Sequence, residues 1–416
     1  MNPSANRALY DSYGFCKLVT SDRYYVRGTS GWDLEAPLTK EGILDWLQCI
    51  RGLDESVAKE VIKKRRHHIA FKIGLAPSEP EFYLVNNQPC LNLYQRPTLE
   101  VVEGEWPHIE EVIDRLTGAS KDPAAKEWFL HLLAAKYQNP AYLPLIGTVF
   151  PTTQGAGKSF LYLVCRELFG PANCVHITRG SLEGNFNANI AGKVFVFADE
   201  IVSTEQYKSI SEKLKYYVAN PHIEVEAKYM NPVTVPNCAM WIFGSNHGQI
   251  PIVLDKDDRR YTILPNFEPI PQAAKDRMKE CFRRGGGFTE DFMPEVRAFA
   301  HYLKNLAVDY KKISAPHANE ARRIVIESGM RGLDAFVHEI QTSGLAGLGT
   351  RIGKHYFDPR GITGWDEMPP ESKLYEMFKG FCAKGKYGVS NESHFRGCIR
   401  SQIPEVLAQV ASSTLH

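Results

Sequence analysis

One stretch of the sequence, residues 143–168, is compatible with few folds. The apolar run LPLIGTVF (143–150) has the branched and aromatic residues of a buried strand, and FLYLVCREL (160–168) has the pattern of a helix. The loop PTTQGAGKS (151–159) joins them. In such a strand–loop–helix unit, backbone N–H groups and the positive end of the helix surround a phosphate. The sequence therefore predicts an α/β fold with a phosphate-binding loop.

The side chains of this loop suit a nucleoside triphosphate. Lys158 is expected to neutralise the β- and γ-phosphates of ATP, and the Ser159 hydroxyl to bind Mg²⁺. Thr152 stands where the pattern GxxxxGK(S/T) has its first glycine, so an ordinary strand-to-helix turn is the alternative. The residues expected to contact the nucleotide are Thr153, Gln154, Gly155, Ala156, Gly157, Lys158, Ser159 and Phe160.

A second apolar strand, KVFVFA (193–198), ends in two acids, Asp199 and Glu200. Ligands of open α/β sheets bind at the carboxyl ends of the strands. Asp199 is expected to hold the water shell of Mg²⁺, and Glu200 to polarise the attacking water as the general base. A strand that ends in a solvated acidic turn is the plainer interpretation of the same residues.

A third strand, AMWIFGS (239–245), leads to Asn246, whose amide is expected to orient the attacking water and sense the γ-phosphate. The segment DDRRY (257–261) then begins a further strand over 261–264. An arginine there can stabilise transition-state charge on the nucleotide of a neighbouring subunit, although a surface Arg–Asp pair is the alternative. The order and spacing of all four segments favour an ATP-hydrolysing site.

Four segments within about 125–270 resemble superfamily-3 helicases of the AAA+ class, particularly the helicase portion of phage and plasmid primase-helicases. They are TTQGAGKSF, FNANIAGKVFVFADE, EKLKYYVANPHIEVEAKYMNPVTVPN, and MWIFGSN followed by DDRRY. The resemblance implies an AAA+ P-loop core in a hexameric ring, with ATP between subunits and 3′-to-5′ movement on single-stranded or forked DNA.

The same resemblance implies roles for individual residues. Lys158 and Ser159 match the Walker A pair, and Asp199 and Glu200 match the Walker B pair. Asn246 matches the motif C sensor. Arg260 matches the arginine finger that acts on the neighbouring subunit, and does so better than Arg259.

A β-hairpin is predicted just before the third strand. Residues 223–227 and 232–236 alternate apolar and polar side chains, and residues 228–231 form the tip. In the resembling helicases this hairpin projects into the ring channel, where Lys228 would contact DNA phosphates and Tyr229 would stack on a base or sugar. An exposed turn with one lysine is the alternative. Lys213 and Lys215, on the preceding helix, are weaker candidates for DNA contact.

The remaining chain divides into four regions around this core (141–270). We expect a mixed α/β region (1–95), a helical oligomerisation segment (96–140), a helical region (271–345) and a small helical or winged-helix-like unit that binds DNA (346–416). The first contains short strands at Tyr24–Val26 and Phe82–Val85 and one helical segment near 44–64. Residues 63–68 (KKRRHH) form its solvated basic end, and residues 344–353 form a linker.

Composition sets wider limits. The net charge of +1 does not indicate nucleic-acid binding by itself, so any basic surface must be local. No apolar run reaches the roughly 18 residues of a membrane span, and no secretion signal is recognisable, so we expect a cytoplasmic protein without a membrane partner. The nine cysteines form no CxxC pair, which favours buried free thiols over a zinc site.

The sequence thus predicts an ATP-dependent DNA helicase or translocase for replication of a phage, plasmid or mobile element, with a primase or polymerase as an expected partner. One alternative is an AAA+ ATPase that remodels proteins, which would carry an aromatic-hydrophobic pore loop in place of the lysine. A second alternative is a replication initiator or scaffold that binds ATP without unwinding DNA.

Overall fold

A computed structural model describes most of the chain. The described residues are 13–28, 31–65, 67–178, 182, 187–199, 207–226, 232–246, 254, 257–268, 270–283, 287–329, 333–347, 351–352, 355–356, 371–385, 389–396 and 399. The chain forms two compact units, one of Met1–Ile252 with Arg259–Arg322, the other of Val253–Asp258 with Arg323–His416. In the described part, no helix combines the length and apolarity needed to cross a membrane.

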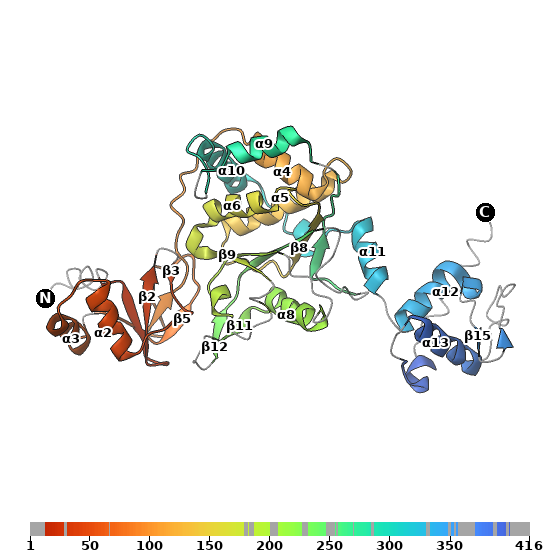
Figure 1. Ribbon diagram of the computed structural model, residues 1–416, viewed down its shortest axis with the longest axis horizontal. Helices are drawn as coiled ribbons and strands as arrows, with labels where there is room; N and C mark the ends of the chain where they lie inside the picture. Colours follow the sequence, from red (N-terminus) through yellow and green to blue (C-terminus); the bar gives the residue numbers. More distant parts are fainter. Residues whose placement is uncertain are drawn as a thin grey trace. The chain divides into compact units, whose positions relative to one another are not determined.

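A five-stranded parallel sheet forms the centre of the first unit (Figure 1). Its order is β14-β8-β13-β10-β9, and every neighbouring pair is parallel. The strands are β8 (Gly147–Thr152), β9 (Cys174–Ile177), β10 (Phe195–Asp199), β13 (Met240–Asn246) and β14 (Tyr261–Ile263). The predicted α/β fold with a parallel sheet is confirmed. The strand expected over 143–150 begins later, because Leu145 has a φ of 58° and cannot extend the strand.

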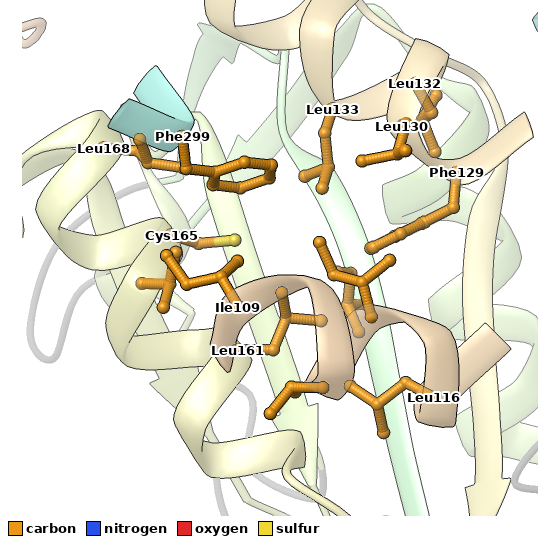
Figure 2. Close-up of a cluster of buried hydrophobic side chains, with 14 of the residues drawn as sticks. Ile109, Leu116, Phe129, Leu130, Leu132, Leu133, Leu161, Cys165, Leu168 and Phe299 are labelled. Atoms are coloured by element: carbon orange, nitrogen blue, oxygen red, sulfur yellow. The ribbon is translucent and has the colours of Figure 1, made fainter. Parts of the chain in front are cut away.

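Helices cover both faces of this sheet, because successive side chains of a strand point to opposite faces. Ile242 faces α4 (Pro107–Thr117), α5 (Pro123–Gln138) and α6 (Lys158–Phe169) within the main apolar core, part of which Figure 2 shows. Its neighbour Trp241 faces the other way and stacks on Tyr217 of α8 (Tyr207–Ala219), with ring centroids 5.7 Å apart.

Helix α5 lies within the segment expected to be helical (96–140) and ends before Pro140. Asp122 begins it by accepting a hydrogen bond from the N–H of Ala125. This helix is buried on all sides along its middle, since every residue from Trp128 to Lys136 is buried. The cause is its position: α5 packs against α4, α10 (Met293–Asn305) and the short helix η3 (Lys312–Ser314) as well as the sheet.

Among its described residues, the N-terminal region contains two small sheets and the helices α2 and α3. The strands are β1 (Phe15–Leu18), β2 (Arg23–Gly28), β3 (Gly31–Trp32), β4 (His68–Ala70), β5 (Lys72–Gly74), β6 (Phe82–Val85) and β7 (Gln88–Asn92). The single helix expected near 44–64 is wrong. Gly52, with a φ of 64°, separates α2 (Lys40–Cys49) from α3 (Glu55–Lys63).

The basic run at the end of α3 is only partly solvated, which corrects its prediction as a solvated helix end. Lys64 pairs with Glu60 on the surface. His67, however, is buried, with its ring centroid 5.0 Å from that of Phe15. Burial lowers the pKa of His67, so this side chain adds no exposed positive charge to the run.

The predicted β-hairpin is present. Strands β11 (His222–Val225) and β12 (Val233–Pro236) pair antiparallel, with Val225 opposite Val233. The tip, including Lys228 and Tyr229, lies outside the described residues. Asn187 fixes the base of the hairpin, because its side-chain amide donates to Glu224 O at 2.8 Å and its oxygen accepts from Glu226 N at 2.7 Å.

The second unit has a small helical core of its own. Its elements are α12 (Leu333–Gly347), α13 (Glu371–Gly385) and the paired strands β15 (Arg351–Ile352) and β16 (His355–Tyr356); α11 (Glu320–Gly329) leads into it. Leu374 and Phe378 of α13 are buried in this core. Residues 344–347 belong to α12 rather than to a linker.

The last described helix of this unit begins after a side-chain cap. Asn391 caps it, because its side-chain oxygen accepts a hydrogen bond from the N–H of His394 at 2.9 Å. The backbone oxygen of Ser390 accepts from the Tyr375 hydroxyl. Arg396 is partly exposed and pairs with Glu392 one turn away.

The cysteines that the structure describes are free thiols. Those at 16, 90, 165, 174, 238, 281 and 382 are buried, and Cys49 is exposed. Burial raises the pKa of the Cys281 thiol to about 11, which keeps it protonated at neutral pH. The prediction of buried free thiols therefore holds for all of these residues except Cys49.

Candidate functional site

Three of the residues singled out in the sequence end neighbouring strands of the sheet. Thr152 ends β8, Asp199 ends β10 and Asn246 ends β13, the strand between them. In the strand pairing, Asn246 lies opposite Thr152 and Asp199 lies opposite Gly244. Because these strands are parallel, the three residues share one edge of the sheet, which is the edge where α/β proteins bind ligands.

The loop after β8 has the backbone that a phosphate-binding loop needs. Gly155 and Gly157 have φ values of 80° and 103°, in the region that side chains disfavour. A Cβ on Gly157 would also lie 2.8 Å from Cγ1 of Val112. Helix α6 begins at Lys158, so the amides of its first turn, which have no partner within the helix, are turned toward the loop.

Lys158 lies beneath this loop and is 6% exposed. Its ammonium donates to the Thr152 hydroxyl at 2.9 Å and to the carbonyl of Ser245 at 3.3 Å. Thr152 therefore has a clear structural place where the usual pattern has glycine: it is the last residue of an extended strand, and its hydroxyl holds the lysine. Two further hydroxyls here, of Thr153 and Ser245, are buried without a hydrogen-bond partner in the described structure.

Asp199 and Lys158 converge over Gly244. A Cβ on Gly244 would lie 2.6 Å from Oδ1 of Asp199 and 3.1 Å from Cδ of Lys158. Any side chain at this position would therefore push apart the carboxylate and the lysine stem. A glycine inside a strand often marks such a close approach, so Gly244 within its apolar strand is the sequence feature that could have indicated this contact.

One cavity of about 430 Å³ opens at this edge. The sheet side contributes residues 154–160 and Asp199, including the exposed Ser159. The opposite side comes from α9 (Gln272–Glu280) and the residue just beyond its end: Lys275, Met278, Lys279 and Phe282. A cavity of this volume lies within the usual range for small-molecule sites. The sequence predicted a helical region over 271–345, which contains α9, but assigned none of its residues to this site.

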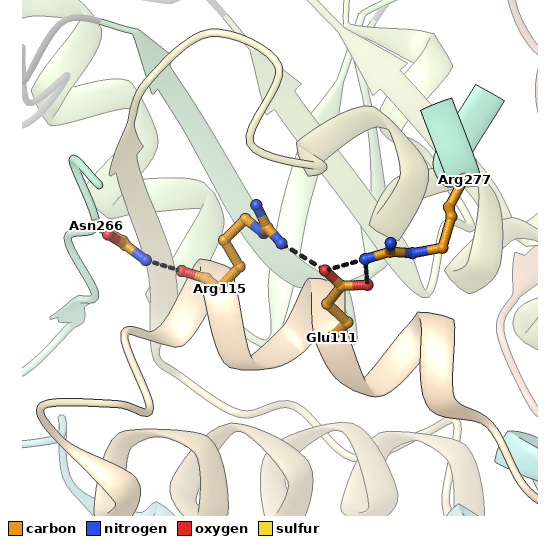
Figure 3. A network of polar contacts seen from close by, with 4 residues as sticks. All are labelled: Glu111, Arg115, Asn266 and Arg277. Carbon is orange, nitrogen blue, oxygen red and sulfur yellow. Dashed lines mark hydrogen bonds and ion pairs between the residues drawn. The ribbon is translucent and has the colours of Figure 1, made fainter. Parts of the chain in front are cut away.

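A network of polar contacts holds α9 beside the loop (Figure 3). Arg277 of α9 donates to both carboxylate oxygens of Glu111 on α4 at 3.0 Å, and Arg115 donates to the same carboxylate at 2.7 Å. Asn266, which follows β14, donates to the carbonyl of Arg115 at 2.6 Å. Helix α4 also supplies Val112, the residue packed against Gly157, so α9 and the loop share one support.

The groups in this cavity fit a magnesium nucleotide. Ser159 and Asp199 offer a hydroxyl and a carboxylate, and Mg²⁺ prefers such oxygen ligands while keeping several waters and phosphate oxygens. Lys158 and the first amides of α6 supply positive charge for phosphates. Residues 154–160 thus line one cavity, whereas Thr153, which was also expected to contact the nucleotide, is not among its lining residues.

Arg260 lies at the other edge of the sheet. It directly precedes β14, and its carbonyl accepts a hydrogen bond from Gly147, the first residue of β8, at 2.7 Å. The strands run parallel from there toward the cavity edge. Arg260 and the cavity of the same chain are therefore separated by the length of the sheet.

The other predicted site residues are placed only in part. Glu200, Lys228 and Tyr229 lie outside the described residues, and the structure gives Asn246 a backbone position alone. The weaker candidates for DNA contact bond within the protein. Lys213 donates to the carbonyl of Leu182 at 3.1 Å, and Lys215, 8% exposed, pairs with Glu212 at 3.0 Å.

Comparison with known proteins relates this chain to phage replication proteins. Residues 150–260 match a "Family of unknown function (DUF5906)". The chain is 24% identical over 284 residues to the "DNA Primase-polymerase" of Nitratiruptor phage NrS-1, an alignment that covers 66% of this chain and 38% of that protein. The chain thus spans well under half of that relative.

Two solved apo structures of the NrS-1 C-terminal region have a similar fold. Each has a TM-score of 0.62, with sequence identities of 18% and 17%. They cover 80% and 82% of this chain, and the matches cover 77% and 79% of their own chains. The three-dimensional similarity therefore shows a common fold across most of the chain.

Proposed function

We propose that this chain is an ATP-hydrolysing DNA helicase or translocase, with an AAA+ core of the superfamily-3 type, that acts in the replication of a phage or related element. The observation that carries the proposal is the convergence of Lys158 and Asp199 over Gly244, beside a glycine loop in a single cavity. A cation for phosphates and an oxygen ligand for Mg²⁺ then face the same nucleotide.

In the proposed reaction, these residues bind the phosphates, hold Mg²⁺ and activate the attacking water. Lys158, held by Thr152, is ready to pair with the β- and γ-phosphates once a nucleotide enters. Ser159 and Asp199 hold Mg²⁺, which adds positive charge to the phosphates when bound. Glu200 takes a proton from the attacking water, and Asn246 orients that water.

DNA is the proposed partner, in single-stranded or forked form. The hairpin β11–β12 and the similarity to a phage "DNA Primase-polymerase" support this assignment. Lys228 and Tyr229 at the tip then contact the phosphates and bases of the strand.

The position of Arg260 away from its own cavity supports a ring, proposed as a hexamer, in which the arginine completes the site of the next subunit. A primase or polymerase is a natural partner, and the C-terminal unit is a second proposed DNA contact of winged-helix type.

Steady-state ATP hydrolysis with and without single-stranded DNA tests the proposal. We expect DNA to stimulate wild-type turnover, Lys158→Ala to abolish turnover, and Lys228→Ala to keep the basal rate while losing the stimulation. Wild-type turnover that ignores DNA would eliminate the nucleic-acid motor.

The similarity to a phage "DNA Primase-polymerase", whose name mentions no unwinding, favours one second candidate, a replication protein that binds ATP without unwinding DNA. Glu200→Gln separates the two possibilities. In a motor, this variant binds ATP but does not hydrolyse it, and the unwinding of a forked DNA stops with it. If the protein is a scaffold, the wild type does not unwind the forked DNA, and the Glu200→Gln variant gives the same result as the wild type.

A further inference from the structure

The side chains of the α9 region that line the cavity follow a helical repeat. They stand at positions 275, 278, 279 and 282, a spacing that places them on one face of the helix and its immediate continuation. Met278 packs closely on the loop, since a Cβ on Gly157 would lie 3.7 Å from its sulfur. One whole face of α9 is thus turned to the phosphate-binding loop.

Lys275 is the charged residue of this face that lies nearest the loop. A Cβ on Gly155 would lie 4.0 Å from Cε of Lys275. The side chain is half-buried, and within the described residues no carboxylate lies within ion-pair distance of it. Lys279, by contrast, is largely exposed and pairs with Asp276 at 3.4 Å. An ammonium held over a phosphate loop, with no carboxylate partner among the residues that the structure describes, is placed to pair with an anionic ligand.

The opposite attachment of α9 keeps this ammonium in place. Arg277 lies two residues from Lys275, roughly on the other side of the helix, and is bound to Glu111 on α4. Helix α4 also contacts the loop through Val112. Lys275 and the loop are therefore carried by elements that are fastened to each other.

We infer that Lys275 is a second cationic contact for the polyphosphate of the nucleotide, reaching it from the side opposite Lys158. The inference rests on the proposed function, which assigns this cavity to a nucleoside triphosphate. It adds a binding residue that the phosphate-loop pattern does not contain. On this assignment, α9 covers the phosphate side of the site. Lys275 then favours nucleotides with more phosphates and does not distinguish between bases.

Nucleotide affinities of the full chain test the inference. Isothermal titration with Mg²⁺ and ATP, ADP or AMP is compared for wild type, Lys275→Ala, Lys275→Arg and the control Lys304→Ala. Lys304 is an exposed lysine of α10 away from the cavity. We expect Lys275→Ala to weaken ATP binding about tenfold, as loss of one charge-assisted hydrogen bond does. AMP binding should change less, Lys275→Arg should retain most of the affinity, and Lys304→Ala should equal wild type.

A second measurement uses the wild-type chain, so it decides the matter even if Lys275→Ala does not fold. An amine-acylating ester modifies exposed lysines, and mass spectrometry gives the extent at each one. ATP with Mg²⁺ should protect Lys275 and leave Lys304 unchanged.

The outcomes separate this inference from the function on which it rests. If Lys158→Ala abolishes ATP binding while Lys275→Ala binds normally and ATP gives Lys275 no protection, the inference is overturned and the proposed function stands. If the wild type binds no ATP, both are overturned.

Discussion

At the scale of the residue, Gly244 decides how closely the candidate catalytic groups approach. A Cβ there would meet the Asp199 carboxylate at 2.6 Å and the Lys158 stem at 3.1 Å. Gly244→Ala should therefore keep the fold but lower the turnover number for ATP about 100-fold, the usual effect of a displacement of about 1 Å at a reacting centre. Initial rates of hydrolysis at saturating ATP measure this turnover number, and thermal melting checks that the variant is folded.

Gly147 provides the matched control for this substitution. It lies on the neighbouring strand β8, where a Cβ would meet Cε2 of Phe243 at 2.6 Å within the core. Gly147→Ala should cost about 2 kcal/mol of unfolding free energy through overpacking, with turnover of the folded fraction little changed. Equal losses of turnover in the two variants would show that position 244 acts only through packing.

Lys136 carries a prediction about pH. It is fully buried at the end of α5, and its ammonium donates to the carbonyls of Pro140, Tyr142 and Cys238. Burial lowers the pKa of Lys136 from 10.5 to about 8. Between these two values the folded chain holds fewer protons than the unfolded chain, so this residue makes stability rise with pH across that window.

Urea unfolding of wild type and Lys136→Met at pH 7, 8, 9 and 10, at fixed ionic strength, measures this effect. The difference between the two proteins removes the contributions of the many tyrosines and cysteines that titrate in the same range. Over the whole window up to pH 10.5, the stability of wild type relative to the variant should increase by about 3 kcal/mol. If the unfolding free energy of wild type relative to Lys136→Met stays constant or falls as the pH rises, this prediction is wrong.

At the scale of the element, the contact between α9 and α4 should affect binding more than stability. The side chains of Arg277 and Glu111 are 46% and 36% exposed, and ion pairs of this kind stabilise a protein by less than about 1 kcal/mol. Arg277→Ala should thus leave the unfolding free energy almost unchanged. It should weaken ATP binding by at most about fivefold, since the coupling cannot exceed the energy of the contact that is lost.

Lys59→Ala is the control for that variant, because Lys59 forms a similarly exposed pair with Glu55 on α3, far along the chain from the cavity. Its ATP affinity should equal that of wild type. The same loss of affinity in both variants would trace the effect to net charge rather than to the position of α9.

The elements that sequence predicts well here are those whose signal is local. The apolar runs before Asp199 and Asn246 fixed both strands and the edge where they end, since strand ends need only a few consecutive residues. Helix α9 could not be assigned to the site, because nothing near Lys275 in the sequence shows that it returns to a loop more than a hundred residues earlier. The break at Gly52 and the late start of β8 at Gly147 depended on single backbone angles that a period of apolar residues does not reveal.

At the scale of the whole molecule, the proposed role of Arg260 requires more than one chain. Lys158→Ala and Arg260→Ala proteins should each be inactive alone. Mixed in equal amounts, they should recover about a quarter of wild-type ATP hydrolysis, the fraction of random interfaces that combine an intact loop with an intact arginine. Arg260→Ala mixed with the double variant of both positions is the control and should stay inactive. Absence of any recovery would place the arginine outside the site.

The polarity of the parallel sheet has a numerical consequence for such an assembly. The cavity lies at the carboxyl edge of the sheet and Arg260 lies at its amino edge. Copies in which Arg260 completes the neighbour's site must therefore associate head to tail. In an open row of copies, the copy at one end always lacks a donor, and the row holds one finished site fewer than it has members. Only a closed circle gives every member a finished site, so activity per chain would step upward when the last copy joins.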